Sequence, residues 1–201
     1  VLNNGVWKAS DESEQGIRKR PGLQGPIDDA FMDSFLFVLP SSQSSDLTFQ
    51  KWNDDEIRHA TRHWRKHFRG DVQSVMDIDL TKEQIDKHNL ILFGDPDSNS
   101  AIARLGDGLP VTWTEDAIKL GTNTYPRSGH AVAMIYPNPI NPRRYVVLNS
   151  GFTFREYDYL NNARQVPKLP DWAIMDVSAG ATMRDPGMIR AAGFFDEQWN
   201  P

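Results

Sequence analysis

Residues 89–105 read NLILFGDPDSNSAIARL, and this stretch decides the predicted fold. It opens with a continuous apolar run at residues 90–93, long enough for a strand buried on both faces and too short for a helix. Residues 94–97 (GDPD) break the strand. Residues 98–100 (SNS) offer capping side chains for a helix with Ile102 and Leu105 on its apolar side. Strand, polar turn and helix form the repeating unit of a parallel α/β sheet, in which ligands bind beyond the carboxyl ends of the strands.

The composition is that of an ordinary soluble domain. The chain has 201 residues, of which 39% are hydrophobic and 24% are charged. Its net charge of -5 gives no reason to expect nucleic acid or an anionic membrane as a partner. No apolar run approaches the ~18 residues of a membrane span, and the absence of cysteine rules out disulfides and thiolate chemistry. We expect no cofactor.

The remaining segments alternate between strand and helix patterns. We expect strands at residues 34–40, 73–80, 109–113, 131–136, 145–149 and 172–177. Helices are expected at residues 53–70, 81–87, 98–105 and 151–165. The short connector at 137–142 favours an antiparallel pair, because a parallel crossover needs about a dozen residues. The pattern predicts an α/β three-layer sandwich, Rossmann-like or flavodoxin-like, with a mostly parallel sheet and at least one antiparallel strand.

The chain divides into two parts. Residues 1–26 have little periodicity and are expected to form an N-terminal arm, which could be the remnant of an upstream domain because the chain begins at Val1 without Met. Residues 27–201 are expected to form a single α/β domain.

The turn at residues 94–100 is the candidate ligand-binding loop. Its candidate ligand-binding residues are Asp95, Asp97, Ser98, Asn99 and Ser100. The glycines of a dinucleotide-binding loop and the lysine of a Walker loop are absent, and two carboxylates would repel phosphate. Neutral hydroxyl ligands, or a metal bridged by a carboxylate, would suit the loop better than a nucleotide. A plain helix cap is the favoured interpretation.

The sequence offers weak candidates for a serine hydrolase, which needs a serine, a histidine and an orienting acid. Ser128 precedes a strand, the wrong end for a nucleophile elbow, and Ser150 follows a strand without the Gly-x-Ser-x-Gly pattern. His130 is expected to be satisfied by backbone. Asp28 and Asp29 are adjacent at a strand entrance and should point to opposite sides. A free-standing hydrolase would draw on Asp29, Ser41, Asp95, Asn99 and Ser150 with His130.

A histidine stripe lies on the helix expected at residues 53–70. His59, His63 and His67 recur every four residues, so adjacent pairs could share a metal ion. The helical wheel places the stripe away from the apolar face, beside Arg58, Arg62, Arg65 and Arg69. Because these cations would oppose a divalent ion, we expect a solvated outer face and no metal site.

Three segments carry a resemblance to a known family: residues 19–31 (KRPGLQGPIDDAF), 89–96 (NLILFGDP) and 191–196 (AAGFFD). The chain resembles the carboxyl-terminal region of large bacterial prolyl-oligopeptidase-like or esterase-like α/β-hydrolase proteins. The resemblance implies that the nucleophile elbow and catalytic triad lie upstream of Val1, in a hydrolase domain that would be the partner of this one. It also favours a secreted or periplasmic location, and no catalytic residue is carried over.

Three functions therefore remain open. The first is a non-catalytic, Rossmann-like accessory domain of a larger serine hydrolase. The second is a free-standing hydrolase with an unrecognised Ser/His site. The third is a module that binds a small sugar or a phosphate-bearing ligand through the loops at residues 94–100 and 150–151.

Overall fold

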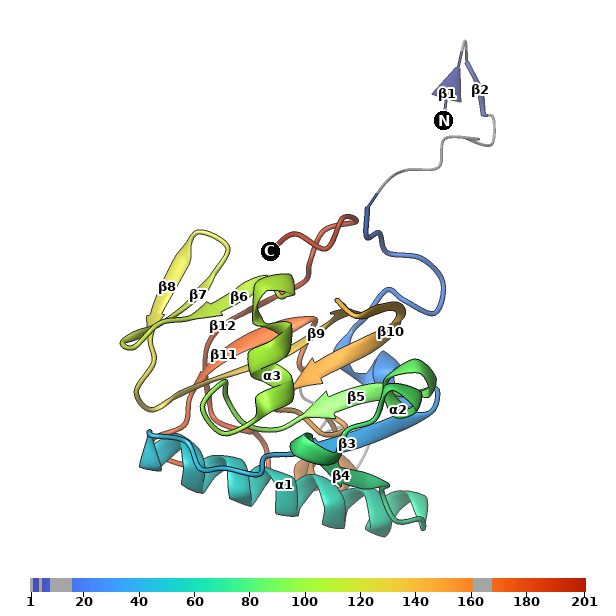
Figure 1. The fold of residues 1–201 in the computed structure, drawn as a ribbon. Helices are drawn as coiled ribbons and strands as arrows, with labels where there is room; N and C mark the ends of the chain where they lie inside the picture. The colour runs from blue at the N-terminus through green and yellow to red at the C-terminus, as the bar shows by residue number, and fades with distance from the viewer. Residues whose placement is uncertain (1, 4, 8–15, 161–167) are drawn as a thin grey trace.

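A seven-stranded sheet forms the centre of the fold in the computed structural model, which describes residues 2–3, 5–7, 16–160 and 168–201. The strand order is β12-β11-β9-β10-β5-β3-β4 (Figure 1). The strands are β3 (Phe35–Leu39), β4 (Ser74–Met76), β5 (Asn89–Leu92), β9 (His130–Asn138), β10 (Asn141–Leu148), β11 (Trp172–Asp176) and β12 (Met188–Gly193).

Two smaller sheets accompany it. One is a three-stranded antiparallel sheet of β6 (Val111–Trp113), β7 (Ala117–Leu120) and β8 (Asn123–Pro126), and the other pairs β1 (Leu2–Asn3) with β2 (Val6–Trp7). The helices are α1 (Leu47–Phe68), α2 (Lys82–Lys87) and α3 (Ser100–Leu105). Short 3-10 turns are η1 (Ile27–Phe31), η2 (Asp77–Asp79), η3 (Gly106–Gly108) and η4 (Glu156–Tyr159).

The central sheet is mixed. β4, β3, β5 and β10 pair in parallel, whereas β10, β9, β11 and β12 pair in antiparallel fashion. The prediction of an α/β fold with an antiparallel element is confirmed, and β9 and β10 form the expected antiparallel pair. A mostly parallel sheet is not what the structure shows, because β9, β11 and β12 add an antiparallel half to the parallel strands.

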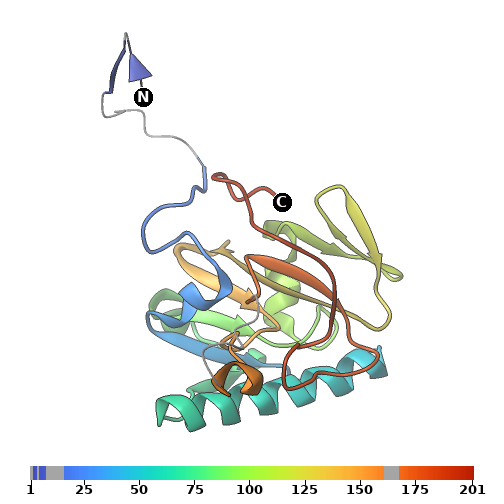
Figure 2. The same ribbon diagram turned by 180° about the vertical axis from the view of Figure 1, so that it is seen from behind.

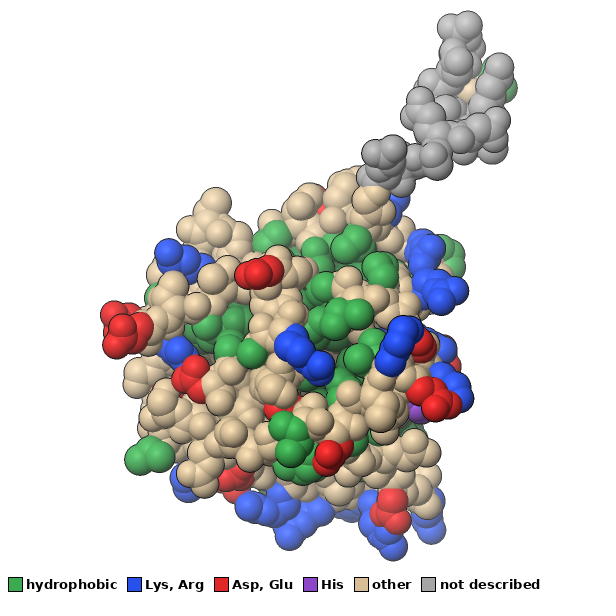
Figure 3. All heavy atoms as spheres, in the orientation of Figure 1, with side chains coloured by type: hydrophobic (Ala, Val, Ile, Leu, Met, Phe, Trp, Pro, Cys, Tyr) green, Lys and Arg blue, Asp and Glu red, His purple; other side chains and the backbone are tan. Residues whose placement is uncertain are grey.

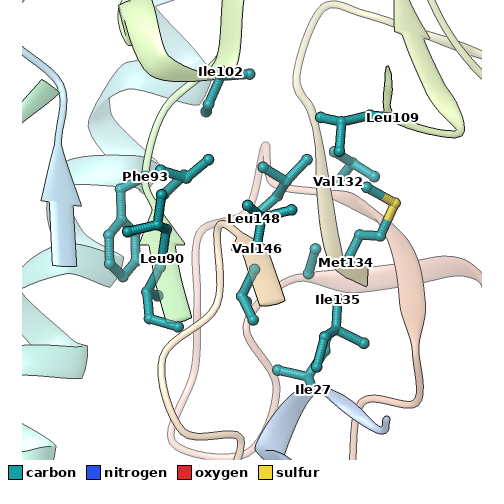
Figure 4. Packing of buried hydrophobic residues seen from close by; sticks show 14 of the residues in the cluster. Ile27, Leu90, Phe93, Ile102, Leu109, Val132, Met134, Ile135, Val146 and Leu148 are labelled. Atoms are coloured by element: carbon teal, nitrogen blue, oxygen red, sulfur yellow. The ribbon is translucent and has the colours of Figure 1, made fainter. Parts of the chain in front are cut away.

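Helices lie on both faces of the sheet. The chain moves from β3 to β4 through α1, then reverses across β3 to reach β5 through α2. Right-handed crossovers in opposite directions place their helices on opposite faces. Figures 1 and 2 show α1 along one side of the sheet, and Phe35 of β3 faces this helix, with its ring centroid 4.7 Å from that of Trp64. On the other side, Ile102 of α3 lies toward Leu148 of β10 (Figure 4).

The expected helix at residues 151–165 is wrong over its described part. Only η4 is helical there, and residues 161–167 lie outside the described residues. Tertiary contacts hold the segment out of a helix. Thr153 donates from both its amide and its hydroxyl to Asp28, and Arg155 pairs with Glu56. Such contacts outweigh the small differences in helix propensity between residues.

Helix α1 begins earlier than the sequence indicates. Its cap is Asp46, not Asn53, because Asp46 Oδ1 accepts from the amides of Thr48 at 2.9 Å and Phe49 at 3.1 Å. Asn53 is instead buried inside the helix. The longer helix reaches the carboxyl end of β3, where the candidate site lies.

The described part of the N-terminal arm packs on the domain from Ile17 onward. The Leu23 side chain is buried. The Lys19 amide donates to the carbonyl of Glu197, and the Lys19 ammonium lies 2.5 Å from a buried carboxylate oxygen of Asp171. Residues 17–26 therefore belong to the same packed body as the strands.

Candidate functional site

The strand order reverses between β3 and β5, and this switch point is where open α/β sheets bind ligands. The loop after β3 (residues 40–46) leads to α1 on one face. The loop after β5 (residues 93–99) leads to α3 on the other face. The end of β10 and the start of β9 lie at the same edge, since β10 runs parallel to β5 and antiparallel to β9. The predicted ligand loop thus lies at the position that the topology favours.

Asp95 is the buried centre of this edge. Its carboxylate accepts hydrogen bonds from the hydroxyls of Ser44 and Ser98, each at 2.7 Å, and from Arg127 Nη2 at 3.2 Å. Burial raises the pKa of Asp95, but these hydrogen bonds outweigh burial and hold the pKa below its usual value. Asp95 is therefore an ionised residue whose two oxygens are engaged by its own chain.

Asp97 is the exposed member of the loop. Its carboxylate lies 2.5 Å from Arg127 Nη2 and accepts from the Ser45 hydroxyl at 3.0 Å. Its side chain is 42% exposed. Arg127, which is 16% exposed, bridges Asp95 and Asp97 and ties β8 to the loop after β5. Of the two loop carboxylates, only Asp97 is accessible to a ligand.

Asn99 and Ser100 form hydrogen bonds that hold the start of α3 in place. Asn99 Oδ1 caps α3 by accepting from the amides of Ala101 and Ile102, and its amide nitrogen donates to the carbonyls of Phe93 and Val38. The Ser100 amide donates to Asp77 at 2.5 Å. The structure brings the five candidate ligand-binding residues together, yet it uses Asn99 as a helix cap, as the favoured interpretation predicts.

Asn149 is a residue that the sequence reasoning missed. Its side-chain oxygen accepts from the Gly94 amide at 2.7 Å, and its nitrogen donates to the carbonyls of Gly94 and Val132. This buried amide joins β5, β10 and β9 at their common edge. The available signal was an Asn directly after a strand, a residue type that tolerates the left-handed backbone found here, with φ of 48°.

Little room remains between these loops. The Gly129 amide donates to Asp46 Oδ2 at 2.6 Å, which ties the start of β9 to the cap of α1. The cavity between these loops, lined by polar residues such as Asp46 and Asp95 and by apolar ones such as Phe49 and Val132, measures about 10 Å³. This is about the volume that one water molecule needs. The crevice at the switch point is closed by polar contacts.

The hydrolase candidates are not assembled into a triad. His130 Nδ1 lies 2.8 Å from the Ser128 carbonyl oxygen, so backbone satisfies it as expected. The Ser150 hydroxyl donates to the Gly151 carbonyl. Asp29 accepts from the Tyr145 hydroxyl at 2.5 Å, while its neighbour Asp28 binds Thr153. The two adjacent carboxylates have separate partners, as the sequence indicates.

Ser34 and His88 form an unexpected pair, with the serine hydroxyl 2.7 Å from His88 Nδ1. The pair is exposed and lies directly before β3 and β5, at the edge of the sheet opposite the switch point. In the described part of the chain, no hydrogen bond joins His88 to a carboxylate. Asp33 lies near His88 but accepts hydrogen bonds from the Ser34 amide and from Arg144 instead, so it does not orient the imidazole as a catalytic acid would.

An open groove adjoins the loop, outside the closed crevice. It has a volume of about 510 Å³ and runs between α3 and the sheet of β6, β7 and β8. Its polar and aromatic lining residues are Asp97, Asp107, Thr112, Trp113, Thr114, Glu115 and Arg127. The volume falls within the range of small-molecule sites, about 300–1,000 Å³.

The expectation of a solvated histidine stripe on α1 is wrong for His63. His63 is buried at 3% exposure because η4 and its flanking residues cover this face of the helix. His63 Nε2 lies 3.3 Å from the Tyr159 hydroxyl, and the His67 ring stacks on Tyr159 at 3.8 Å between centroids. Burial, together with the charges of His67 and His59, lowers the pKa of His63 to about 4. His63 is therefore neutral at neutral pH.

These observations define the class of the protein as an α/β domain with a mixed seven-stranded sheet and a filled switch point. Within the described residues, no helix is long and apolar enough to cross a membrane. Comparisons with protein-family models, with curated proteins and with solved structures gave no match to this chain.

Proposed function

We propose that this chain is a non-catalytic α/β domain that acts as an accessory part of a larger serine hydrolase. The observation that supports a non-catalytic role is the closed switch point. The Asp95 carboxylate accepts hydrogen bonds from Ser44, Ser98 and Arg127. An α/β enzyme would keep reactive groups free at this position. The assignment to a serine hydrolase rests on the sequence resemblance of residues 19–31, 89–96 and 191–196.

The proposal includes a finer description of the fold. The parallel half of the sheet, β4-β3-β5-β10, has the reversal of strand order that is typical of Rossmann-like and flavodoxin-like proteins. We regard β9, β11 and β12 as an antiparallel extension of that half. The extension supports a structural role because it packs Phe195 and Trp199, both buried, against Tyr136 of β9.

Hydrolysis assays on the purified chain test the non-catalytic role. We expect no turnover of p-nitrophenyl esters or prolyl peptides above the buffer rate, and no labelling by a fluorophosphonate. Saturable turnover that is lost in Ser128→Ala, His130→Ala or Ser34→Ala would overturn the proposal. The accessory role has a separate test, the reading frame of the gene. An in-frame Gly-x-Ser-x-Gly upstream would support it, and a frame without any hydrolase domain would contradict it.

A second candidate function is the binding of a small sugar. The observation that favours it is the open groove beside Asp97, where the Trp113 ring lies near carboxylates and threonine hydroxyls. Sugars bind through apolar contact with aromatic rings and hydrogen bonds to polar groups. A thermal-shift screen of sugars and nucleotides tests this function. Stabilisation by a sugar that disappears in Trp113→Ala would support it, and no stabilisation by any ligand would exclude it.

A further inference from the structure

Two histidines and a glutamate converge where α1 meets η4. His59 and His63 lie four residues apart on α1 and therefore share one face of the helix, with ring centroids 5.2 Å apart. Glu156, the first residue of η4, faces them, and its Oε1 lies 3.2 Å from His59 Nε2. One ligand atom from each of the three residues lies within 4.8 Å of the other two.

We propose that His59, His63 and Glu156 bind a divalent transition-metal ion of the Zn²⁺ type, with its fourth coordination position open. The site is independent of the proposed accessory function, because it lies on α1 and η4 and not at the switch point.

The donor set fits this ion. Zn²⁺ binds imidazole nitrogen and carboxylate oxygen at about 2.0–2.2 Å, so neighbouring ligand atoms in a tetrahedral site are about 3.4 Å apart. The pair His59–Glu156 already has nearly this spacing, at 3.2 Å. His63 has to rotate slightly toward the other two to complete the triangle, since the three ligand atoms spread over as much as 4.8 Å.

The surroundings favour three protein ligands and an open position. The three residues line a pocket of about 240 Å³, which leaves room for a water molecule or a substrate group on the ion. The Tyr159 hydroxyl lies 3.3 Å from His63 Nε2, so it can orient the ring when Nδ1 is the ligand atom of His63.

The backbone that carries Glu156 is firmly held. Arg155, its neighbour in sequence, forms two hydrogen bonds to Glu56 of α1, at 2.9 and 3.0 Å. This buried ion pair fixes η4 against the helix that carries both histidines. A site supported in this way is more precise than one on an unsupported loop.

Several cations lie near the proposed ion. Arg58, Arg62 and Lys66 line the same pocket, and Figure 3 shows Lys and Arg side chains gathered along the side of the molecule where α1 runs. Arg58 is neutralised by Asp55 at 2.5 Å, and Arg62 and Lys66 are exposed, where water and salt screen their charge. Their repulsion reduces affinity for the ion, and once the ion is bound they favour an anionic fourth ligand, such as a carboxylate or phosphate.

Titration of the purified full chain with Zn²⁺ tests the proposal. We expect one Zn²⁺ per chain by calorimetry, and Co²⁺ in its place should give the intense visible absorption of a four- or five-coordinate ion. His59→Ala and Glu156→Gln are the informative variants, because both side chains are partly exposed, at 18% and 38%, and their loss spares the core. Each variant should weaken Zn²⁺ binding by about tenfold or more.

His88→Ala is the matched control, since His88 binds Ser34 and is not one of the proposed ligands, and its Zn²⁺ affinity should equal that of the wild type. Far-UV circular dichroism checks that all variants fold. The proposal is overturned if the wild type binds no Zn²⁺, or if either His59→Ala or Glu156→Gln keeps wild-type affinity. Equal loss in His88→Ala would also overturn it.

Discussion

The guanidinium of Arg155 donates two hydrogen bonds to the carboxylate of Glu56, at 2.9 and 3.0 Å. Both side chains are nearly buried, with 8% and 6% exposure. Arg155 Nε also donates to the Thr182 carbonyl at 3.0 Å, so the pair joins three segments of the chain. This contact holds η4 against α1, over described residues for which the sequence predicts a helix beginning at residue 151.

Removal of one partner of this pair should be costly. Arg155→Ala leaves the Glu56 carboxylate buried without its counter-charge, and breaking a buried pair in this way costs about 3–5 kcal/mol. We expect urea denaturation to show a loss of this size in the free energy of unfolding. Lys51→Ala, which breaks the exposed pair with Asp55, should cost about 0–1 kcal/mol. Equal effects from the two variants would show that the buried pair has no special role.

The Asp95 network should make stability depend on acid pH. The pKa of Asp95 in the folded protein lies below the ordinary aspartate value of 3.8, so the ionised form stabilises the fold above this pH. The contribution is lost as the pH falls from 3.8 through the lower folded pKa. We expect the difference in unfolding free energy between wild type and Asp95→Asn to be largest above about pH 4 and to shrink as the pH falls. A difference that stays constant down to pH 2.5 would contradict this role for Asp95.

Asn149 should be difficult to replace. Asn149→Ala orphans the buried amide and carbonyl of Gly94, and unsatisfied buried groups cost about 1–3 kcal/mol. The left-handed backbone at φ 48° adds about 1 kcal/mol for alanine. Denaturant unfolding measures the sum. The exposed Asn123 is the control, and Asn123→Ala should change stability by no more than about 0.5 kcal/mol. A similar small change for Asn149→Ala would disprove the proposed role of this amide.

The sequence correctly predicted those strands and helices whose conformation depends on residues close together in the chain. The apolar run at residues 90–93, the Thr81 cap of α2 and the Asn99 cap of α3 all agree with the structure. In each, residues a few positions apart decide the conformation. The sequence patterns predict no element at β7 and β8, which form a hairpin in the structure, and β7 also pairs with β6.

Contacts distant in sequence set the features that were missed. The sheet is only half parallel because β11 returns to pair with β9, a choice that the spacing of apolar residues does not encode. His63 is buried because a segment 93 positions further along, at Glu156, covers it. A helical wheel considers α1 without the segments that pack on it, and it therefore predicts that the histidine stripe is exposed to solvent. The candidate metal site depends on the same long-range contact.

Gly151 is required by the close approach of its backbone to α1. A Cβ at Gly151 would lie 2.6 Å from Ala60 Cβ, closer than real side chains come. Gly151→Ala should therefore cost about 1–3 kcal/mol through overpacking. Ala60→Gly alone should cost about 1 kcal/mol, the usual penalty for glycine inside a helix.

The double variant separates steric conflict from other causes. In Ala60→Gly/Gly151→Ala, the methyl group only changes sides, so the loss should be smaller than the sum of the single losses by about 1 kcal/mol. Gly106→Ala is the control, because its Cβ would meet open space and its backbone is helical, with φ of -47°. That substitution should be neutral or stabilise by a few tenths of a kcal/mol. Additive losses at residues 60 and 151 would mean that the two backbones can separate without cost, and that Gly151 is not what brings the loop after β10 onto α1.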